Sequence, residues 1–275
     1  HIITMAGMSA LFAALFGTPV TAAVFSMEVI SVGVVYYAAF LPCVVASATA
    51  ALIANRVFHI APTAFSVGLM QSASWDVLLR ALVLAAGCAL VSIAFVACLH
   101  GAGRLYRRYL KNPYVRAAAG GLLIVLLTLL LGTRDYNGAG TDVIARAVEG
   151  GSAKWYAFAL KIIFTALTIG AGFKGGEIVP TFFVGATFGC AFGGLLGLDP
   201  GFAAALGLVA MFCSVVNCPL AALLLSIELF GGGSLLVFAL VCAVSYLLSG
   251  YYSLYSGQHI IYSKLRAEYV NRATH

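Results

Sequence analysis

The sequence contains very few charged side chains for its length. Aspartate, glutamate, lysine and arginine make up 9% of the 275 residues and apolar residues make up 63%, with a mean hydropathy of +1.05. About a quarter of the residues of a typical water-soluble domain are charged, so this composition excludes such a domain. Apolar runs such as 81–99 and 117–131 meet or approach the roughly 20 residues that a helix needs to cross a bilayer. The sequence therefore predicts a membrane protein.

Patterns that would indicate an enzyme or a metal protein are also absent. The five histidines mostly flank apolar segments, and no serine or cysteine motif accompanies them to supply a nucleophile with a base. We therefore expect no catalytic residue, no metal and no cofactor, and a protein that is not an enzyme. The seven cysteines lie in or beside apolar segments without metal-ligand spacing, and we interpret them as small core residues: Cys43, Cys88, Cys98, Cys190, Cys213, Cys218 and Cys242.

The few basic residues gather in two places. The formal net charge is +6, but this clustering does not indicate a nucleic-acid partner. Basic residues concentrate in the cytoplasmic loops of membrane proteins, so we expect both clusters, and the C-terminus, on the cytoplasmic side of the cell membrane. A loop that only sets topology is favoured over a lipid-regulatory role. The clusters are Arg104, Arg107, Arg108, Lys111 and Arg116, and then Lys264, Arg266 and Arg272.

Glycine and proline interrupt many of the apolar runs. Broken segments are tolerated at membrane depth where the freed backbone is buried in protein or lines a wet cavity, which favours a transporter or channel over an anchor. We expect a loop or partial helix at 56–75 and a glycine-rich loop at 132–141, and find no clear strand signal. The expected helices are 3–17, 19–33, 35–55, 75–104, 113–131, 141–149, 153–170, 178–193, 202–216, 219–230, 234–252 and 258–271.

An internal repeat relates residues 6–28 to residues 206–228. Each copy has a short helix of small residues, a break before a proline (Pro19 or Pro219), and a second short helix that ends near a glutamate. Proline suits the first turn of a helix because its missing N–H is not needed there. Broken segments in corresponding positions of two halves point to the binding site of a transporter. The symmetric placement of Glu28 and Glu228 suggests a repeated structural hydrogen bond rather than two separate catalytic roles.

The segment 171–189, AGFKGGEIVPTFFVGATFG, is the most informative part of the chain. Its glycines at 172, 175 and 176 allow backbone to approach a ligand closely, and Pro180 preorganises the first turn of the helix that follows. A helix start presents free N–H groups and a positive dipole end. An anion can therefore bind there without a full positive charge. The alternative is that these glycines and the proline only end one helix and begin the next, without a ligand site.

Glu177 places a carboxylate in this turn, at membrane depth. Intramembrane carboxylates are costly and indicate function, often in a proton relay, which makes Glu177 the candidate for proton transfer. The alternative is that Glu177 caps the dipole of the helix that it opens. Lys174 could pair with Glu177, but we favour a side chain that extends to the membrane interface.

These segments resemble the CLC family of chloride channels and anion/proton antiporters. The run from Gly175 to Pro180 resembles the family's third anion-binding motif, usually Gly-x-Phe-x-Pro, and the C-terminal GQHIIYSKLRAEY is similar to its last helix. The resemblance implies an all-α membrane protein with an inverted-repeat transporter fold of short, broken, tilted helices, assembled as a homodimer. The anion-binding residues that it implies are Gly175, Gly176, the backbone N–H groups of Glu177 and Ile178, and the phenol of Tyr262.

The departures from the family pattern bear on the substrate. Ile178 replaces the usual phenylalanine, and Val29 stands where many family antiporters carry an inner proton-transfer glutamate. The Gly-Gly-Glu variant is similar to the fluoride-exporting branch, although Val179 stands where members of that branch often have threonine. The resemblance thus implies fluoride/proton antiport, with fluoride, protons and the lipid bilayer as partners. The alternatives are a chloride channel or chloride/proton antiporter and, more remotely, a non-transporting membrane scaffold.

The domain organisation follows from the repeat. We expect one CLC transmembrane domain over 1–275, in which 1–56 ends the first half-repeat and 75–271 forms the second. The repeat offset places the partner of 175–180 about 25 residues before His1, where the family carries its gating glutamate. We therefore expect the N-terminal part of the domain to be missing from this sequence.

Overall fold

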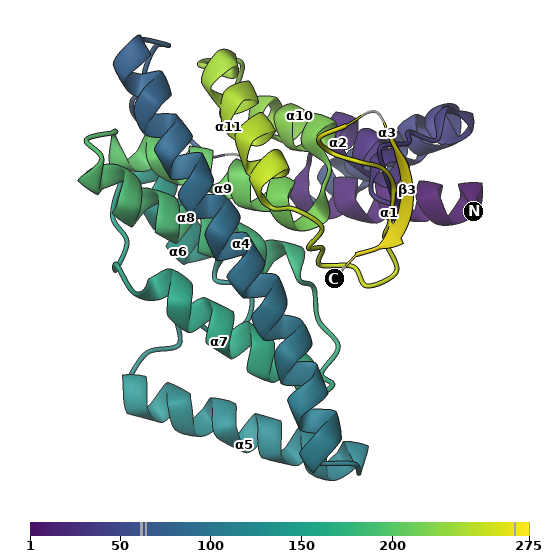
Figure 1. Ribbon diagram of the computed structural model, residues 1–275, viewed down its shortest axis with the longest axis vertical. Helices are drawn as coiled ribbons and strands as arrows, with labels where there is room; N and C mark the ends of the chain where they lie inside the picture. Colours follow the sequence, from purple (N-terminus) through teal and green to yellow (C-terminus); the bar gives the residue numbers. More distant parts are fainter. Residues whose placement is uncertain (61–62, 64, 267, 275) are drawn as a thin grey trace.

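The computed structural model describes residues 1–60, 63, 65–266 and 268–274, and most of them are helical (Figure 1). The helices are α1 (Ile2–Phe16), α2 (Pro19–Glu28), a 3-10 turn η1 (Tyr37–Ala39), α3 (Phe40–Arg56), α4 (Trp75–Tyr109), α5 (Pro113–Leu131), α6 (Thr141–Glu149), α7 (Ala157–Gly170), α8 (Ile178–Leu195), α9 (Pro200–Val216), α10 (Pro219–Phe230) and α11 (Leu235–Leu248). The strands are β1 (Ser31–Val32), β2 (His259–Tyr262) and β3 (Tyr269–Ala273).

Several helices begin directly after a polar residue whose side chain accepts a hydrogen bond from an N–H group of the first turn. The side chain of Asn112 accepts a hydrogen bond from the N–H of Tyr114 at 3.0 Å, and Asp199 accepts one from Phe202 at 2.9 Å. A proline follows each of these residues at the first helical position, where its fixed φ suits the helix. These local signals explain why the predicted starts of α5 and α9 agree with the observed ones to within two residues.

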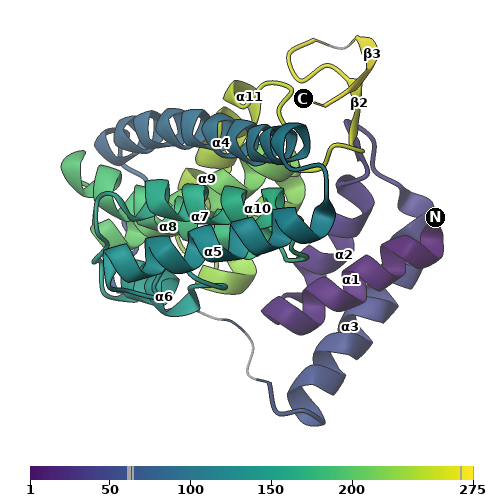
Figure 2. The ribbon, with the colours of Figure 1, turned by 90° about the horizontal axis from the view of Figure 1, so that it is seen from below.

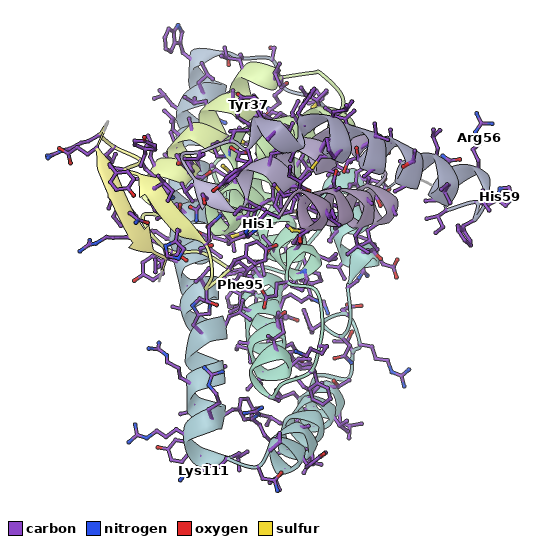
Figure 3. The ribbon with its side chains drawn as sticks, turned by 90° about the vertical axis from the view of Figure 1, so that its right-hand side faces the viewer. His1, Tyr37, Arg56, His59, Phe95 and Lys111 are labelled. Atoms are coloured by element: carbon purple, nitrogen blue, oxygen red, sulfur yellow. The ribbon has the colours of Figure 1, made fainter. Side chains whose placement is uncertain are left out.

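Within the described residues, four helical segments are long and apolar enough to cross a membrane: Tyr37–Arg56, Trp75–Tyr109, Pro113–Leu131 and Ile178–Leu195. The 35 residues of α4 span about 50 Å at roughly 1.5 Å per residue, which exceeds the roughly 30 Å hydrocarbon core. Figure 1 shows α4 as one long rod across the molecule, with α5 at its lower end. Figure 3 shows Lys111 at that end, far from Arg56 and His59 at the tip of α3.

The centre of the core is the crossing of α8 and α9. Residues 201–216 of α9 are all buried, and the glycines of α8 allow the two backbones to touch. A Cβ atom on Gly185 would collide with the carbonyl oxygen of Gly207, and one on Gly189 with the carbonyl oxygen of Ala203. Small residues at such crossings let membrane helices pack closely. This packing fixes the helix that begins at the Gly-Gly-Glu segment.

The two copies of the repeat share their backbone conformation. Gly17 and Asn217 both end their helices in the left-handed region, at φ 69° and 58°. Thr18 and Cys218 follow with nearly equal angles, φ −117° and −121°, and the second helix of each pair then begins at its proline. The helix, break and helix expected from the sequence are therefore present in both copies, as α1–α2 and α9–α10.

Glu28 and Glu228 join the two copies by reciprocal hydrogen bonds. The carboxylate of Glu28, at the end of α2, accepts hydrogen bonds from the first-turn N–H groups of Leu220 (3.2 Å) and Ala221 (2.9 Å) in α10. The carboxylate of Glu228, in the last turn of α10, accepts hydrogen bonds from Val20 (3.0 Å) and Thr21 (2.7 Å) in α2. Reciprocal contacts are typical of an approximate two-fold axis. The prediction of a repeated structural hydrogen bond is confirmed.

The expected C-terminal helix at 258–271 is wrong, and so is the expectation of no strands. The chain instead forms β2 and β3, which pair antiparallel with each other, and β2 pairs in parallel with β1 after the end of α2. Because α2 ends at Glu28 rather than at 33, residues 31 and 32 have backbone groups free to pair with His259 and Ile260. Figure 2 shows this small sheet at the edge of the helical body. The division of the chain into half-repeats stays a prediction.

Candidate anion site at the start of α8

The site begins with a turn that only glycine adopts easily. Gly172 has φ +101°, in the region that favours glycine, and the guanidinium of Arg116 donates a hydrogen bond to the carbonyl oxygen of Ala171 at 3.1 Å. The chain then runs through the exposed Gly175 and Gly176 to Glu177, the residue that precedes the first helical residue of α8. The glycines and this arginine together set the direction in which α8 starts.

The carboxylate of Glu177 does not cap α8. Its side chain accepts no hydrogen bond from the first turn, while its backbone carbonyl accepts two from Thr181, from the hydroxyl at 2.9 Å and from the N–H at 3.2 Å. The N–H groups of Ile178 and Val179 therefore receive nothing from that carboxylate. Unpaired N–H groups at a helix start attract anions.

Two cavities meet at this segment. The arginine-lined cavity, of about 730 Å³, contains Glu177, and the glycine-lined cavity, of about 460 Å³, contains Gly175 and Gly176. Ile169 of α7 lies on the walls of both. Polar or glycine residues on the wall of the arginine-lined cavity are His100, Gly103, Arg104, Arg107, Arg116, Gly170, Gly172, Glu177, Tyr252 and Ser256. The corresponding residues of the glycine-lined cavity are Asn137, Gly138, Lys161, Thr165, Thr168, Lys174, Gly175 and Gly176, together with Tyr136.

The predicted site residues are thus brought together in part. Gly175, Gly176 and Glu177 lie between the two cavities, and Ile178 packs partly buried against the core next to them. Tyr262 lies on β2 with 47% of its surface exposed and its ring 6.0 Å from that of Tyr269, and it is on neither cavity wall. Its role as an anion donor stays a prediction.

Other tyrosines, which sequence reasoning missed, lie nearer to Glu177. Tyr252 lines the arginine-lined cavity. Burial, and more weakly the neighbouring Cys218 thiol and Glu177 carboxylate, raise the pKa of Tyr255, which lies in the segment after α11. A phenol that stays protonated remains a hydrogen-bond donor. The signal in the sequence was the cluster of tyrosines between 251 and 255, directly after the last long apolar run.

The neighbourhood of Val29 is occupied by a fully bonded amide. Gln258 donates hydrogen bonds to the carbonyl oxygens of Val29 (2.7 Å) and Val216 (2.9 Å), and its own oxygen accepts from Asn217 (3.1 Å) and Ser253 (2.7 Å). Gln258 therefore ties the end of α2 to the end of α9. Both oxygens of the adjacent Glu28 already bind α10, which leaves Glu177 as the unbonded carboxylate of this region among the described residues.

Comparisons with known proteins agree on one family. The family model described as "Voltage gated chloride channel" matches residues 1–250. The chain is 36% identical to a "Chloride/fluoride channel protein" of Pseudomonas syringae pv. tomato over 96% of its own length and 59% of that protein. It is 27% identical to "H(+)/Cl(-) exchange transporter ClcA" of Vibrio cholerae over 83% of its own length and 52% of that protein.

A solved structure is similar over almost the whole chain. The crystal structure of a CLC-type fluoride/proton antiporter superposes with a TM-score of 0.89 at 33% identity, over 94% of this chain and 65% of that one. The chain thus spans roughly half to two thirds of the length of the relatives that it matches.

Proposed function

Because this chain belongs to the voltage-gated chloride channel family, we propose that its protein exchanges fluoride for protons across the cell membrane. One observation carries the proposal. An uncapped helix start and an unbonded carboxylate, Glu177, lie together where two cavities meet. The first can hold an anion and the second a proton, so one segment serves both ions.

The helix start suits an anion that must also leave. The N–H groups of Ile178 and Val179, together with the dipole of the 18-residue α8, offer a partial positive charge without a full cation. A transport site must bind tightly enough for entry and weakly enough for exit. The arginines of the arginine-lined cavity raise the local anion concentration beside this site.

Glu177 is the proposed proton carrier. When ionised it accepts hydrogen bonds only, and when protonated it gains an O–H donor. Fluoride is small and strongly hydrated, so a site that removes its water must offer several donors. A protonated Glu177 supplies one of them, so the protonation of Glu177 and the occupancy of the anion site depend on each other.

Fluoride is preferred over chloride on two grounds. Val29 provides no acid at the position of the inner glutamate, and the Gly-Gly-Glu motif precedes α8. The solved structure named for fluoride/proton antiport matches at 33% identity and the relative named for both chloride and fluoride at 36%, whereas the relative named for H(+)/Cl(-) exchange matches at 27%. Chloride transport by the same architecture is the alternative, a non-transporting scaffold is the remote one, and we propose no enzymatic activity.

The surroundings of the site suggest how the protein sits in its membrane. We place the α4–α5 connection, with its basic residues, and the C-terminus on the cytoplasmic side. The residues of α5 are exposed or half-buried, with Gly120 its one buried residue, as expected for a helix against lipid. We propose a homodimer, with helices among 19–33, 35–55, 219–230 and 234–252 facing the partner, because they carry few charges and many small residues.

Flux measurements test the proposal. The full-length protein is reconstituted into liposomes loaded with fluoride or chloride, and external anion and pH are recorded together for wild type, Glu177→Gln and Asp142→Asn. Wild type should move fluoride with opposite proton flow, and Glu177→Gln should lose the proton coupling. Asp142 is an exposed carboxylate in the first turn of α6, so its variant should behave as wild type. A wild type that prefers chloride would refute the fluoride assignment, and normal coupling in Glu177→Gln would remove Glu177 as carrier.

A further inference from the structure

Lys161 of α7 is a buried cation. Its side chain is 1% exposed, and its ammonium donates hydrogen bonds to the backbone carbonyl oxygens of Tyr136 (3.2 Å) and Gly138 (2.6 Å). The same nitrogen lies 4.8 Å from the centroid of the Phe183 ring in α8. Two neutral oxygens and an aromatic face thus surround a full positive charge.

No carboxylate neutralises this charge in the part of the chain that the structure describes. The ion pairs found there are Arg80–Asp76 and Arg146–Asp135, and neither includes Lys161. Burying an unpaired charge is costly, and charged residues at membrane depth generally serve function. Hydrogen bonds to the 136–138 loop alone could be made by a neutral donor, so they do not account for a lysine.

The position of Lys161 beside the candidate anion site explains why a charged residue is buried there. Lys161 lies on the wall of the glycine-lined cavity, whose wall also includes Gly175 and Gly176. The ring of Phe183 that it faces belongs to the second turn of α8, the helix whose start forms the candidate anion site. A charge held by rigid backbone in a water-poor wall acts more strongly than one on an exposed, mobile side chain.

We propose that Lys161 is the fixed counter-charge for a monovalent anion in the glycine-lined cavity. It attracts the anion into the cavity that Gly175 and Gly176 also line, without binding it directly, because its own N–H donors are taken by the loop and the ring. This inference rests on the proposed function in assuming that anions cross here, but it does not depend on which anion is carried. Lys161 is in this sense a positioning residue.

The size of the effect follows from the cavity. A cavity of about 460 Å³ is about 10 Å across, and unit charges that far apart at an effective dielectric constant of about 20 change a binding constant roughly tenfold. Exposed charges are largely screened over such distances. Loss of the buried charge should therefore weaken anion binding about tenfold, whereas loss of an exposed lysine should leave it unchanged.

The test compares variants that separate charge from hydrogen bonding. Calorimetry measures the Kd of fluoride and of chloride for the full-length protein, with thermal stability recorded alongside. Lys161→Arg keeps the charge and should stay within about threefold of wild type, and Lys161→Gln keeps a donor and should bind about tenfold more weakly. Lys154→Gln, which removes an exposed lysine just before α7, should bind as wild type does.

A second variant keeps the test valid if Lys161→Gln does not fold. Thr165→Asp adds a carboxylate one turn along α7 on the same cavity wall, where it offsets the charge of Lys161 at i,i+4 spacing and keeps the lysine side chain in place. It should weaken anion binding as strongly as Lys161→Gln. Unchanged Kd in Lys161→Gln or in Thr165→Asp would overturn the proposal and leave Lys161 a purely structural residue.

The outcomes also separate this inference from the proposed function. If wild type binds and carries chloride rather than fluoride, fluoride exchange is refuted, and the same variants still decide the role of Lys161 through the Kd of chloride. If wild type binds neither anion, both proposals fail. If fluoride transport is confirmed while the variants bind normally, only the counter-charge is refuted.

Discussion

Replacing Glu28 by alanine removes the acceptor that serves the first turn of α10. Its carboxylate accepts hydrogen bonds from Leu220 (3.2 Å) and Ala221 (2.9 Å), and the residue is 6% exposed. A hydrogen bond to a charged group contributes about 1.5–3 kcal/mol. Because Ala221 is fully buried and Glu28 nearly so, water can replace little of what is lost, and Glu28→Ala should lower the free energy of unfolding by about 3–6 kcal/mol.

Glu228 provides an internal comparison. Its two hydrogen bonds, to Val20 (3.0 Å) and Thr21 (2.7 Å), are as short, but its side chain is only half-buried. Water can replace part of what is lost, so Glu228→Ala should cost about 1–3 kcal/mol. The two pairs of bonds close a ring through α2 and α10, and the double variant should therefore lose less than the sum of the single ones.

The assay is unfolding of the purified protein by SDS in mixed micelles, followed by circular dichroism. Glu149→Ala serves as the control, because this exposed carboxylate accepts a weaker hydrogen bond from Ser66 at 3.3 Å and should cost less than about 0.5 kcal/mol. The prediction is refuted if Glu28→Ala is no more destabilising than Glu149→Ala. It also fails if the order of Glu28 and Glu228 is reversed.

Two further predictions concern the packing of α8 and the tyrosines. Gly189→Val should lower the free energy of unfolding by about 1–3 kcal/mol or more, because the added Cβ meets the Ala203 carbonyl oxygen. Gly194→Val, on the open face of α8, should unfold like wild type. Equal stabilities of the two variants would contradict the close crossing of α8 and α9. Tyr255→Phe removes one neutral hydrogen-bond donor, worth about 0.5–1.5 kcal/mol, and should weaken fluoride binding several-fold. Tyr262→Phe should weaken it equally if the phenol of Tyr262 donates to the anion, as the family resemblance implies. Calorimetry on both variants decides between them, and unchanged binding removes that phenol from the site.

Much of the helical plan could be predicted from the sequence because its signals are local. Proline after Asn112 or Asp199 marks a helix start whatever the helix later packs against. The repeat was visible because Pro19 and Pro219, and Glu28 and Glu228, stand at matching positions. The identity of the groups that each glutamate binds depends on packing between segments about 200 residues apart, and no local pattern contains it.

The failures have the same origin. The sequence pattern predicts a helix over 258–271, and the resemblance to the family's last helix agrees with it. Pairing of His259 and Ile260 with Ser31 and Val32, and of β2 with β3, instead gives this segment its strands. Lys161 escaped notice because it is one lysine within an apolar helix, and its partners are carbonyl oxygens that every residue possesses. The start of α8 was predictable since glycine, glutamate and proline follow one another there. The walls of the two cavities beside it come from distant parts of the chain: α4, α5, α7, the 136–139 loop and the 252–256 segment.

The exchange of carboxylates between the helix pairs also constrains how the protein is made. Thr21 is synthesised 207 residues before Glu228, its acceptor, a delay of roughly 10 to 40 s at roughly 5–20 residues per second of translation. During that interval the first turn of α2 has no acceptor from its final structure, and unsatisfied N–H groups are not tolerated in lipid. The first helix pair must therefore wait at the insertion machinery, or at the wet edge of the membrane, until the second pair leaves the ribosome.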